Sequence, residues 1–509
     1  MPEYLHPGVY IQEESSGAKP IEGASTSTAA FVGLAPRGRP NRAAFITSWA
    51  EYVRRFGGLD KTSDMSLAVY QFFQNGGKRT YIVRALSADA LAARAVLTIG
   101  TATVKVVAAG AGAWGNDITV KWRKNKFNAA TFDFEIELSS GEAESYSGLG
   151  ASEGSERFYY SVLNRDSQLI RIETEVDLPT DVVQVEYASS ALSAGSDTAP
   201  AADGTSTPVT KLNAIDAGNA LAALNPVDDA SILVIPGCES EVIVKGLEYV
   251  ESRRDMIYVV DSERPGAEEE GSKSITKVKN LLGFDQPPAN AVVLTKSKYA
   301  ALYFPWVYVS DPFSKVENSR RLVPPSGMIA GLYARIDNTR GVWKAPAGFE
   351  ATLSGILGVQ TQLTDVDQDG LNPIGVNCIR TFAAAGTVVW GARTLATQSD
   401  PEYRYVPVRR TAMFLEKSLY RGTQWVVFEP NDEPLWSSIR FNLNAFMTTL
   451  FRAGAFQGGK PSDAFLVKCD ADNNIQATID AGQVHILVAF APLKPAEFVI
   501  IHITQLRKE

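Results

Sequence analysis

The sequence predicts a multidomain α/β protein, and three observations support this fold class. The chain has 509 residues, which is too long for one ordinary domain and long enough for several domains that each bury a core. Strand-like and helical segments alternate over residues 27–84 and again from residue 231, as expected of α/β layers. Between residues 90 and 210 the pattern changes to short alternating strands, which indicates a β-rich insertion.

The composition excludes several classes of protein. Hydrophobic residues make up 45% of the chain and charged residues 21%, as in globular proteins. The net charge of -8 argues against a nucleic-acid partner, because phosphate neutralisation needs a clustered basic surface. The first residues lack the features of a signal peptide, and the sequence contains no run of 18 uncharged apolar residues. We therefore expect no direct membrane insertion, and a chain that stays in the cytosol where it is made or leaves by lysis.

The first 89 residues divide into an arm and an α/β segment. Residues 1–22 form an N-terminal arm with one short extended segment, followed by a polar stretch that reads as a flexible tether. The residues of this segment are Gly8, Val9, Tyr10, Ile11 and Gln12. Residues 23–89 form the first part of an α/β core. Strands are predicted at 28–34 and 80–84, and helices at 48–56 and 66–75.

The rest of the chain divides into three segments. The insertion covers 90–210, with strands predicted at 103–108, 118–123, 132–138 and 182–187 and a low-complexity linker at 188–208. Residues 211–398 resume the α/β pattern, as a second layer or a continuation of the first. Its strands are predicted at 231–235, 256–261, 291–294 and 303–309. Residues 399–509 form an α+β C-terminal domain and arm. Helices are predicted there at 408–420 and 433–453, and strands at 425–429, 464–469, 483–492 and 496–505.

Two glycine-rich motifs match nucleotide-binding patterns only in part. Gly110, Gly112 and Gly115 have dinucleotide-fingerprint spacing, but the residues after them alternate as a strand instead of opening a helix. We interpret this motif as a β-turn. Residues 454–460 have phosphate-loop spacing, but Pro461 stands where a Ser or Thr must hold magnesium. We interpret this second motif as the turn that ends a helix.

The patterns for metal binding and for catalysis are also incomplete. Asp365, Asp367 and Asp369 begin like a calcium loop, but Val376 occupies the position of the closing Glu. The three histidines, His6, His485 and His502, all lie outside the α/β region, where a hydrolase would carry its triad. The three cysteines form no Cys-x-x-Cys pair, and each is expected to be a small buried residue. The sequence therefore predicts no catalytic, cofactor-binding or metal-binding residues.

Recognisable motifs are spread along nearly the whole chain, beginning in residues 4–13 and 28–38, and are fewest in the insertion. They are densest in Tyr405-Val-Pro-Val-Arg409-Arg410 and in Phe428-Glu-Pro-Asn431. These motifs resemble contractile tail sheath proteins of bacteriophages and phage-like injection systems. The family implies a subtilisin-like fold for the middle α/β domain. The absence of a histidine there implies that this fold is not a protease.

The resemblance implies a structural function without catalysis. Sheath subunits polymerise as helical sixfold rings around an inner tube and contract to drive the tube through a target envelope. The implied partners are other copies of the chain, the inner tube protein, and baseplate and tail terminator proteins. The implied location is the bacterial cytoplasm during assembly, and then a virion tail or a released phage-like particle. The alternatives are an α/β hydrolase or nucleotide-dependent enzyme, and a tube or capsid component.

Two sets of residues are candidates for contacts within such a particle. Isolated terminal strands are edges that need partners, and the resemblance implies that both arms add strands to a neighbouring subunit. The C-terminal residues of this kind are Phe498, Val499, Ile500 and Ile501. A cationic excess in residues 402–421 indicates either a solvated face or an inner-tube contact. Its basic residues are Arg404, Arg409, Arg410, Lys417 and Arg421.

Overall fold

The structure is a computed structural model, and it describes most of the chain in two compact units. The described residues are 19–87, 89–184, 186–197, 211–266, 269, 271–285 and 287–501. The large unit comprises residues 25–409, and the terminal unit joins residues 1–24 to residues 410–509.

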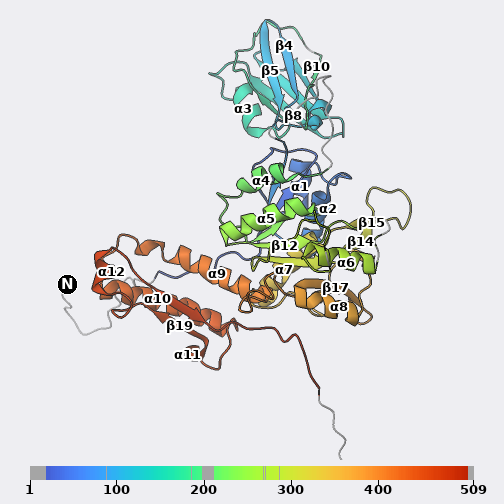
Figure 1. Cartoon of the computed structure of the whole chain (residues 1–509). Helices are drawn as coiled ribbons and strands as arrows, with labels where there is room; N and C mark the ends of the chain where they lie inside the picture. Colours follow the sequence, from blue (N-terminus) through green and yellow to red (C-terminus); the bar gives the residue numbers. More distant parts are fainter. Residues whose placement is uncertain are drawn as a thin grey trace, which may run out of the picture. The chain divides into compact units, whose positions relative to one another are not determined.

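One eight-stranded sheet forms the centre of the large unit, with strand order β18-β17-β13-β12-β11-β1-β3-β2 (Figure 1). The six inner strands are parallel, and the edge strands β2 and β18 are antiparallel to their neighbours. Strand β1 pairs with both β3 and β11, so the two α/β segments of the sequence share one continuous sheet. The strands are β1 (Ala29–Gly33), β2 (Ala44–Ile46), β3 (Thr80–Arg84), β11 (Ile232–Val234), β12 (Ile257–Asp261), β13 (Ala300–Phe304), β17 (Val376–Phe382) and β18 (Gly386–Val389).

Helices cover the sheet and bury its strands. Every residue of β1, β11, β12 and β13 is buried, as the continuous apolar runs of parallel strands require. Helix α2 packs against α7, and α4 packs against α5; both pairs also contact the sheet. The helices of this part are α1 (Trp49–Phe56), α2 (Asp64–Gln74), α4 (Ala214–Ala222), α5 (Ser240–Arg253), α6 (Ser272–Leu281), α7 (Ser326–Arg340) and α8 (Asp365–Leu371).

Local signals in the sequence define where these helices start and stop. The side chain of Ser48 accepts a hydrogen bond from the backbone N–H of Glu51 and so caps α1. Gly57 ends the same helix in the left-handed conformation, with φ 94°. A small three-stranded sheet of order β15-β14-β16 completes this part of the unit. Its strands are β14 (Val307–Ser310), β15 (Arg320–Val323) and β16 (Ile356–Val359).

The insertion folds around a hydrophobic core of its own (Figure 1). Its strands form two antiparallel sheets, β10-β6-β7-β8 and β4-β5-β9. Phe132, Phe134 and Tyr159 are fully buried between them. Its elements are β4 (Arg94–Ile99), β5 (Ala102–Ala108), the 3-10 helix η1 (Ala113–Asp117), β6 (Ile118–Lys124), β7 (Thr131–Leu138), β8 (Ala143–Gly150), α3 (Tyr159–Asp166), β9 (Ile170–Ile172) and β10 (Ala188–Ala191).

The terminal unit is built around helix α10. Asp432 caps this helix and Pro434 lies in its first turn, while Trp436, Ile439 and Leu443 bury one face. Helix α9 passes from the large unit into the terminal unit, and β19 pairs with β20. The elements are α9 (Val406–Gly422), η3 (Gln424–Val426), α10 (Glu433–Arg452), α11 (Pro461–Ala464), β19 (Phe465–Lys468), α12 (Gln476–Asp480) and β20 (Leu487–Phe490).

The structure corrects several elements predicted from the sequence. The predicted strands at 182–187 and 291–294 are not strands in the described residues. The start of the predicted linker is β10, which pairs with β6. The predicted strand at 303–309 is interrupted at Pro305, which has no N–H to donate to a ladder, and divides into β13 and β14. Residues 425–429 include part of η3 and a left-handed Phe428, with φ 70°, so they do not form a strand.

Candidate functional site

The glycines of the dinucleotide-like motif lie where the insertion meets the sheet core. Residues after Gly112 form the short 3-10 helix η1 and then strand β6, so the motif does not open an α-helix. A Cβ on Gly110 would lie 2.5 Å from the carbonyl oxygen of Gly38. A Cβ on Gly112 would lie 2.6 Å from a guanidinium nitrogen of Arg84. The spacing therefore reflects close backbone packing between two parts of the large unit.

Arg84 joins those two parts. Its side chain is 2% exposed and donates hydrogen bonds to the carbonyl oxygens of Ala35 and Gly38 in the core and of Ala111 in the insertion, at 2.6–3.0 Å. Its Nη2 also lies 3.7 Å from a carboxylate oxygen of Asp197. Burial lowers the pKa of the guanidinium to about 10, which leaves it charged at neutral pH. Sequence reasoning gave no signal for this residue, because a single arginine at the end of a strand is unremarkable.

The other two motifs have structural explanations. Gly454, with φ 79°, follows the last residues of α10, and Pro461 begins α11, which confirms the turn that ends a helix. Residues 365–371 form helix α8. The Thr364 side chain accepts from the backbone N–H of Asp367, whose carboxylate accepts from Thr364. Asp367 is thus part of a capping box.

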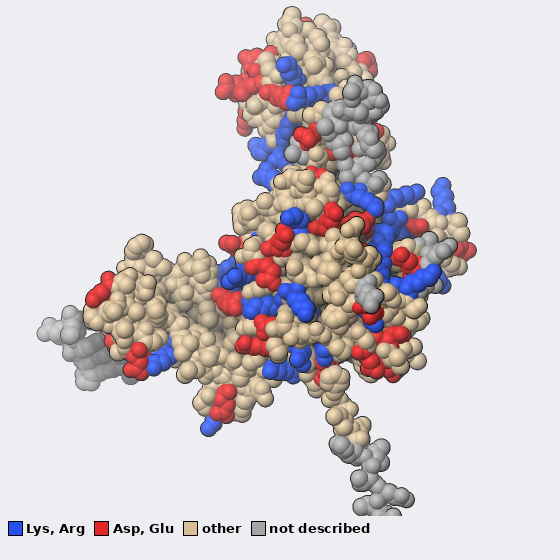
Figure 2. All heavy atoms as spheres, viewed as in Figure 1, with Lys and Arg blue, Asp and Glu red and all other residues tan. Residues whose placement is uncertain are grey.

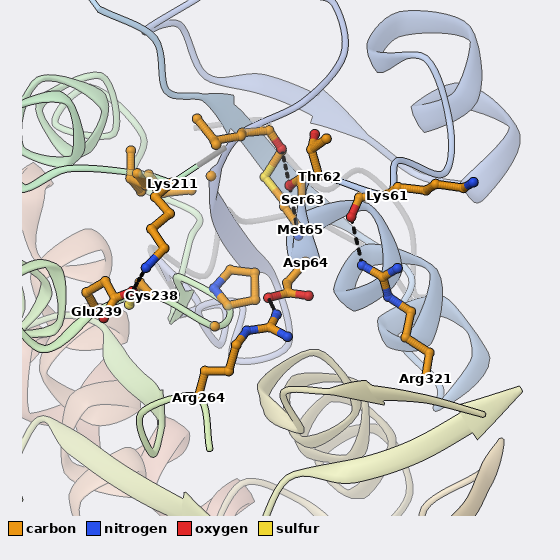
Figure 3. A pocket seen from close by; sticks show the side chains of 16 residues that line it. Lys61, Thr62, Ser63, Asp64, Met65, Lys211, Cys238, Glu239, Arg264 and Arg321 are labelled. Carbon is orange, nitrogen blue, oxygen red and sulfur yellow. Dashed lines mark hydrogen bonds and ion pairs between the residues drawn. The ribbon is translucent and has the colours of Figure 1, made fainter. Parts of the chain in front are cut away.

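A pocket of about 290 Å³ opens at the carboxyl ends of β1 and β11 (Figure 3). Gly33 and the turn through Gly237 form its floor, and the first turn of α2 contributes Ser63 and Asp64. Among the described residues, no histidine lines the pocket. Burial raises the pKa of the Cys238 thiol in its wall to about 12, so this thiol is not an activated nucleophile.

Asp261, at the end of β12 beside this pocket, is a buried carboxyl group. Its oxygens accept hydrogen bonds from the backbone N–H groups of Gly237 and Ser326 and from the Ser326 hydroxyl, at 2.6–3.2 Å. Burial nevertheless raises its pKa to about 7. The Ser326 hydroxyl thus helps to satisfy the buried carboxylate at the start of α7.

We expect Asp261 to make stability depend on pH. Its folded pKa lies above the value of about 3.9 for an unfolded chain, so the folded state binds more protons and loses stability as pH rises from about 4 to 7. In Asp261→Asn this loss is absent. The stability of the variant relative to the parent should rise by about 2–4 kcal/mol over that range. Urea denaturation at several pH values measures the difference, and parallel curves for the two proteins would show that Asp261 does not titrate there.

The structure describes only part of the proposed strand-exchange residues. Gly8, Val9, Tyr10, Ile11 and Gln12 lie outside the described residues. The C-terminal residues Phe498, Val499, Ile500 and Ile501 are 72–80% exposed and do not form a strand within this chain. Residues 19–24 are held within the terminal unit: the backbone N–H of Lys19 donates to Asn442 in α10, and that of Ala24 donates to Ser418 in α9.

The five basic residues of the cationic stretch do not form one surface patch. The guanidinium of Arg409 stacks on the rings of Tyr299 and Tyr403, at 4.6 and 4.8 Å from the ring centroids. Arg409 is 3% exposed. Arg410 is equally buried. Arg404 and Lys417 are partly exposed, and Arg421 is exposed. We expected Arg409 and Arg410 to present positive charge at the surface, but both side chains are buried. The number of basic residues in a stretch does not show whether their side chains are buried or stacked on aromatic rings.

Within the part of the chain that the structure describes, no helix is both long and apolar enough to cross a membrane.

Comparisons with known proteins agree on one family. Residues 209–395 match the model of the phage tail sheath protein central domain, and residues 398–505 match the phage tail sheath C-terminal domain. The tail sheath protein of Vibrio phage KVP40 is 30% identical over 235 residues, which cover 45% of this chain and 34% of the relative. That of Enterobacteria phage T4 is 28% identical over 207 residues, covering 39% and 28%. The matched part is about a third of the length of these curated relatives.

Solved structures with under a quarter sequence identity share the fold. The sheath of an extracellular contractile injection system in the contracted state has a TM-score of 0.59 at 22% identity, with 99% of both chains covered. A sheath tail protein from Listeria innocua has a TM-score of 0.64 at 15% identity, covering 94% of this chain and 97% of the other. The two family models together cover more than half of the sequence in their expected order. The chain belongs to the phage tail sheath protein family.

Proposed function

We propose that the chain is a structural subunit of a contractile tail sheath. It polymerises as helical sixfold rings around an inner tube, and the polymer shortens to drive the tube through a target envelope. The observation that carries this proposal is the match to both sheath domain models, in order, over residues 209–505. The similarity to sheath chains solved in the contracted state supports it. No comparable observation favours the hydrolase or nucleotide-dependent enzyme.

In this proposal the large unit has a subtilisin-like architecture without enzymatic activity. The parallel sheet supports the architecture. The described residues that line the pocket include no histidine, and the pKa of the Cys238 thiol is raised. Both observations support a role without catalysis. The insertion lies on the outside of the polymer, because a large added domain is tolerated where it obstructs neither ring stacking nor the tube.

Both arms add strands to neighbouring subunits. The apolar side chains of residues 498–501 are exposed in the single chain, which is unfavourable for a soluble monomer unless a partner covers them. Among the described residues, β19 and β20 pair only with each other, so their outer edges can accept an added strand. The hydrogen bonds of Lys19 and Ala24 to α10 and α9 anchor the base of the N-terminal arm, which is consistent with an arm that continues to a neighbour.

The remaining contacts are with other components of the particle. Of the five basic residues in the cationic stretch, Arg404, Lys417 and Arg421 are at least partly exposed, and we assign them to weak polar contacts with the inner tube. Exposed ion pairs contribute about 0–1 kcal/mol each, so such contacts break readily when the sheath expands. Baseplate and tail terminator proteins bind the ends of the polymer. Assembly takes place in the bacterial cytoplasm, before the particle is released as a virion tail or phage-like particle.

Substitution of the C-terminal arm tests the proposed function. In Val499→Asp/Ile501→Asp, two carboxylates replace exposed apolar side chains on one face of the added strand. We expect the melting temperature of the dispersed chain to be unchanged and long tubes to be lost, as seen by negative-stain microscopy. Val183→Asp, at an exposed valine of the insertion, is the control and should still form tubes. Normal tubes from the double variant would contradict strand addition by this arm.

A further inference from the structure

The loop between α9 and α10 presents an aromatic side chain to solvent. Phe428 has a relative exposure of 102%, so no described residue covers its ring. Its backbone is left-handed, with φ 70°, a conformation that bulky residues rarely adopt. Val427 beside it is 60% exposed. A strained and uncovered aromatic residue of this kind points to a contact that the described residues do not include.

This loop is held in place before any contact forms. The Asn431 side chain donates to the carbonyl oxygen of Gln483 at 2.8 Å and accepts from the indole N–H of Trp436 at 2.9 Å. An anchor that is already ordered loses little conformational freedom on binding. We call Val427 and Phe428 the loop surface, and it is a preformed apolar anchor.

The described base of the N-terminal arm leads to this loop. The Nζ of Lys19 lies 4.1 Å from the centroid of the Trp425 ring. Toward lower residue numbers the arm therefore follows α9 to its end and arrives three residues before Phe428. The contacts that mark this course join Ala24 to Ser418 in α9, Ile21 to Gly422 at the end of α9, and Lys19 to Trp425 in the loop.

The part of the arm that precedes Lys19 includes an apolar segment long enough to reach the loop surface. Residues 1–18 lie outside the described residues, and their longest apolar run is at positions 9–11. This run ends eight residues before Lys19, a chain length of at most about 29 Å. Phe428 follows Trp425 by three residues, or at most about 11 Å. The run can therefore reach the loop surface of its own chain.

The chemistry of the terminal unit favours an apolar partner. Figure 2 shows charged side chains gathered over the large unit, whereas few of them lie on the visible face of the terminal unit. In an extended segment alternate side chains point the same way, so Val9 and Ile11 share one face. That face is apolar and matches Val427 and Phe428, which offer no charge to a polar partner.

We propose that, in the dispersed chain, residues 9–11 of the N-terminal arm pack on Val427 and Phe428 of the same chain. The docking itself does not rest on the sheath function, but its consequence does. In a sheath this contact has to break before the arm can add a strand to a neighbour. The docked arm therefore delays the joining of free subunits.

Hydroxyl-radical footprinting of the full dispersed chain, read by mass spectrometry, tests the proposal. Phe127 of the insertion is 98% exposed and serves as the internal reference of the same residue type. We expect Phe428 to be oxidised about tenfold more slowly than Phe127 at every protein concentration, as for a contact formed about 90% of the time. Val9→Ser/Ile11→Ser should bring the two rates together. Leu5→Ser, in the arm but outside the apolar run, is the control and should leave Phe428 protected.

Three results would overturn the proposal. Equal oxidation of Phe428 and Phe127 in the parent would show that the Phe428 ring has no cover. Protection of Phe428 that grows with protein concentration would assign the loop surface to a second copy of the chain. Protection that Val9→Ser/Ile11→Ser retains would assign it to another segment. Because each result is obtained on dispersed chains, none of them depends on whether the protein forms tubes.

Discussion

Gly327→Ala should destabilise the large unit by about 2–3 kcal/mol or more, even though alanine is the best helix former. Gly327 lies in α7 at its contact with α2. A Cβ there would lie 2.3 Å from the carbonyl oxygen and 2.6 Å from the Cα of Ala68. Both atoms belong to the backbone of a buried helix, so they cannot move aside as a flexible side chain would. The helices must separate, and the packing between them is lost.

Gly218→Ala provides the matched control. Gly218 lies in α4, where an added Cβ meets no atom within 4 Å. The same substitution should therefore stabilise the protein by about 0.5–1 kcal/mol, through helix propensity alone. Urea denaturation of both variants measures the effects. A destabilisation of the same size in both would contradict the packing described for α2 and α7.

Arg84→Met is expected to have the second large effect, a loss of about 3–5 kcal/mol. The substitution keeps a long side chain but removes the donors to Ala35, Gly38 and Ala111. Three carbonyl oxygens, all buried or partly buried, then lose a donor, and Asp197 loses its ion pair. Because these bonds join the insertion to the sheet core, hydrogen exchange should accelerate first in the segments on either side of that junction.

Arg94→Met is the control for loss of a positive charge. Arg94 is 68% exposed and pairs with Glu173 at 3.4 Å, so its removal should change stability by at most about 1 kcal/mol. Equal effects of the two substitutions in chemical denaturation would mean that Arg84 does not hold the insertion against the core.

The sequence predicted elements whose signals are local. Helix α10 follows from Asp432, Pro434 and the spacing of Trp436, Ile439 and Leu443. Strand β12 follows from an uninterrupted apolar run that is buried throughout. The motifs between residues 405 and 431 pointed to the family that the comparisons then established.

The sequence could not predict features that depend on distant pairings. Strand β1 pairs with β11 about 200 residues later in the chain, and no local pattern encodes that neighbour. The pocket of about 290 Å³ combines α2, the end of β1, the turn after β11 and strand β15, so it exists only after the sheet has formed. The stacking of Arg409 on Tyr299, about 110 residues earlier in the chain, likewise exists only in the folded protein.

Helical reconstruction from cryo-electron micrographs of the concentrated protein would show whether this chain forms a contractile sheath. We expect hollow tubes of stacked sixfold rings. In them residues 498–501 of each subunit form a strand on the β19–β20 sheet of a neighbour, and the insertion lies on the outer surface. Dispersed single particles at all protein and salt concentrations, or tubes in which each C-terminal segment folds back on its own subunit, would contradict the proposed sheath and its strand exchange.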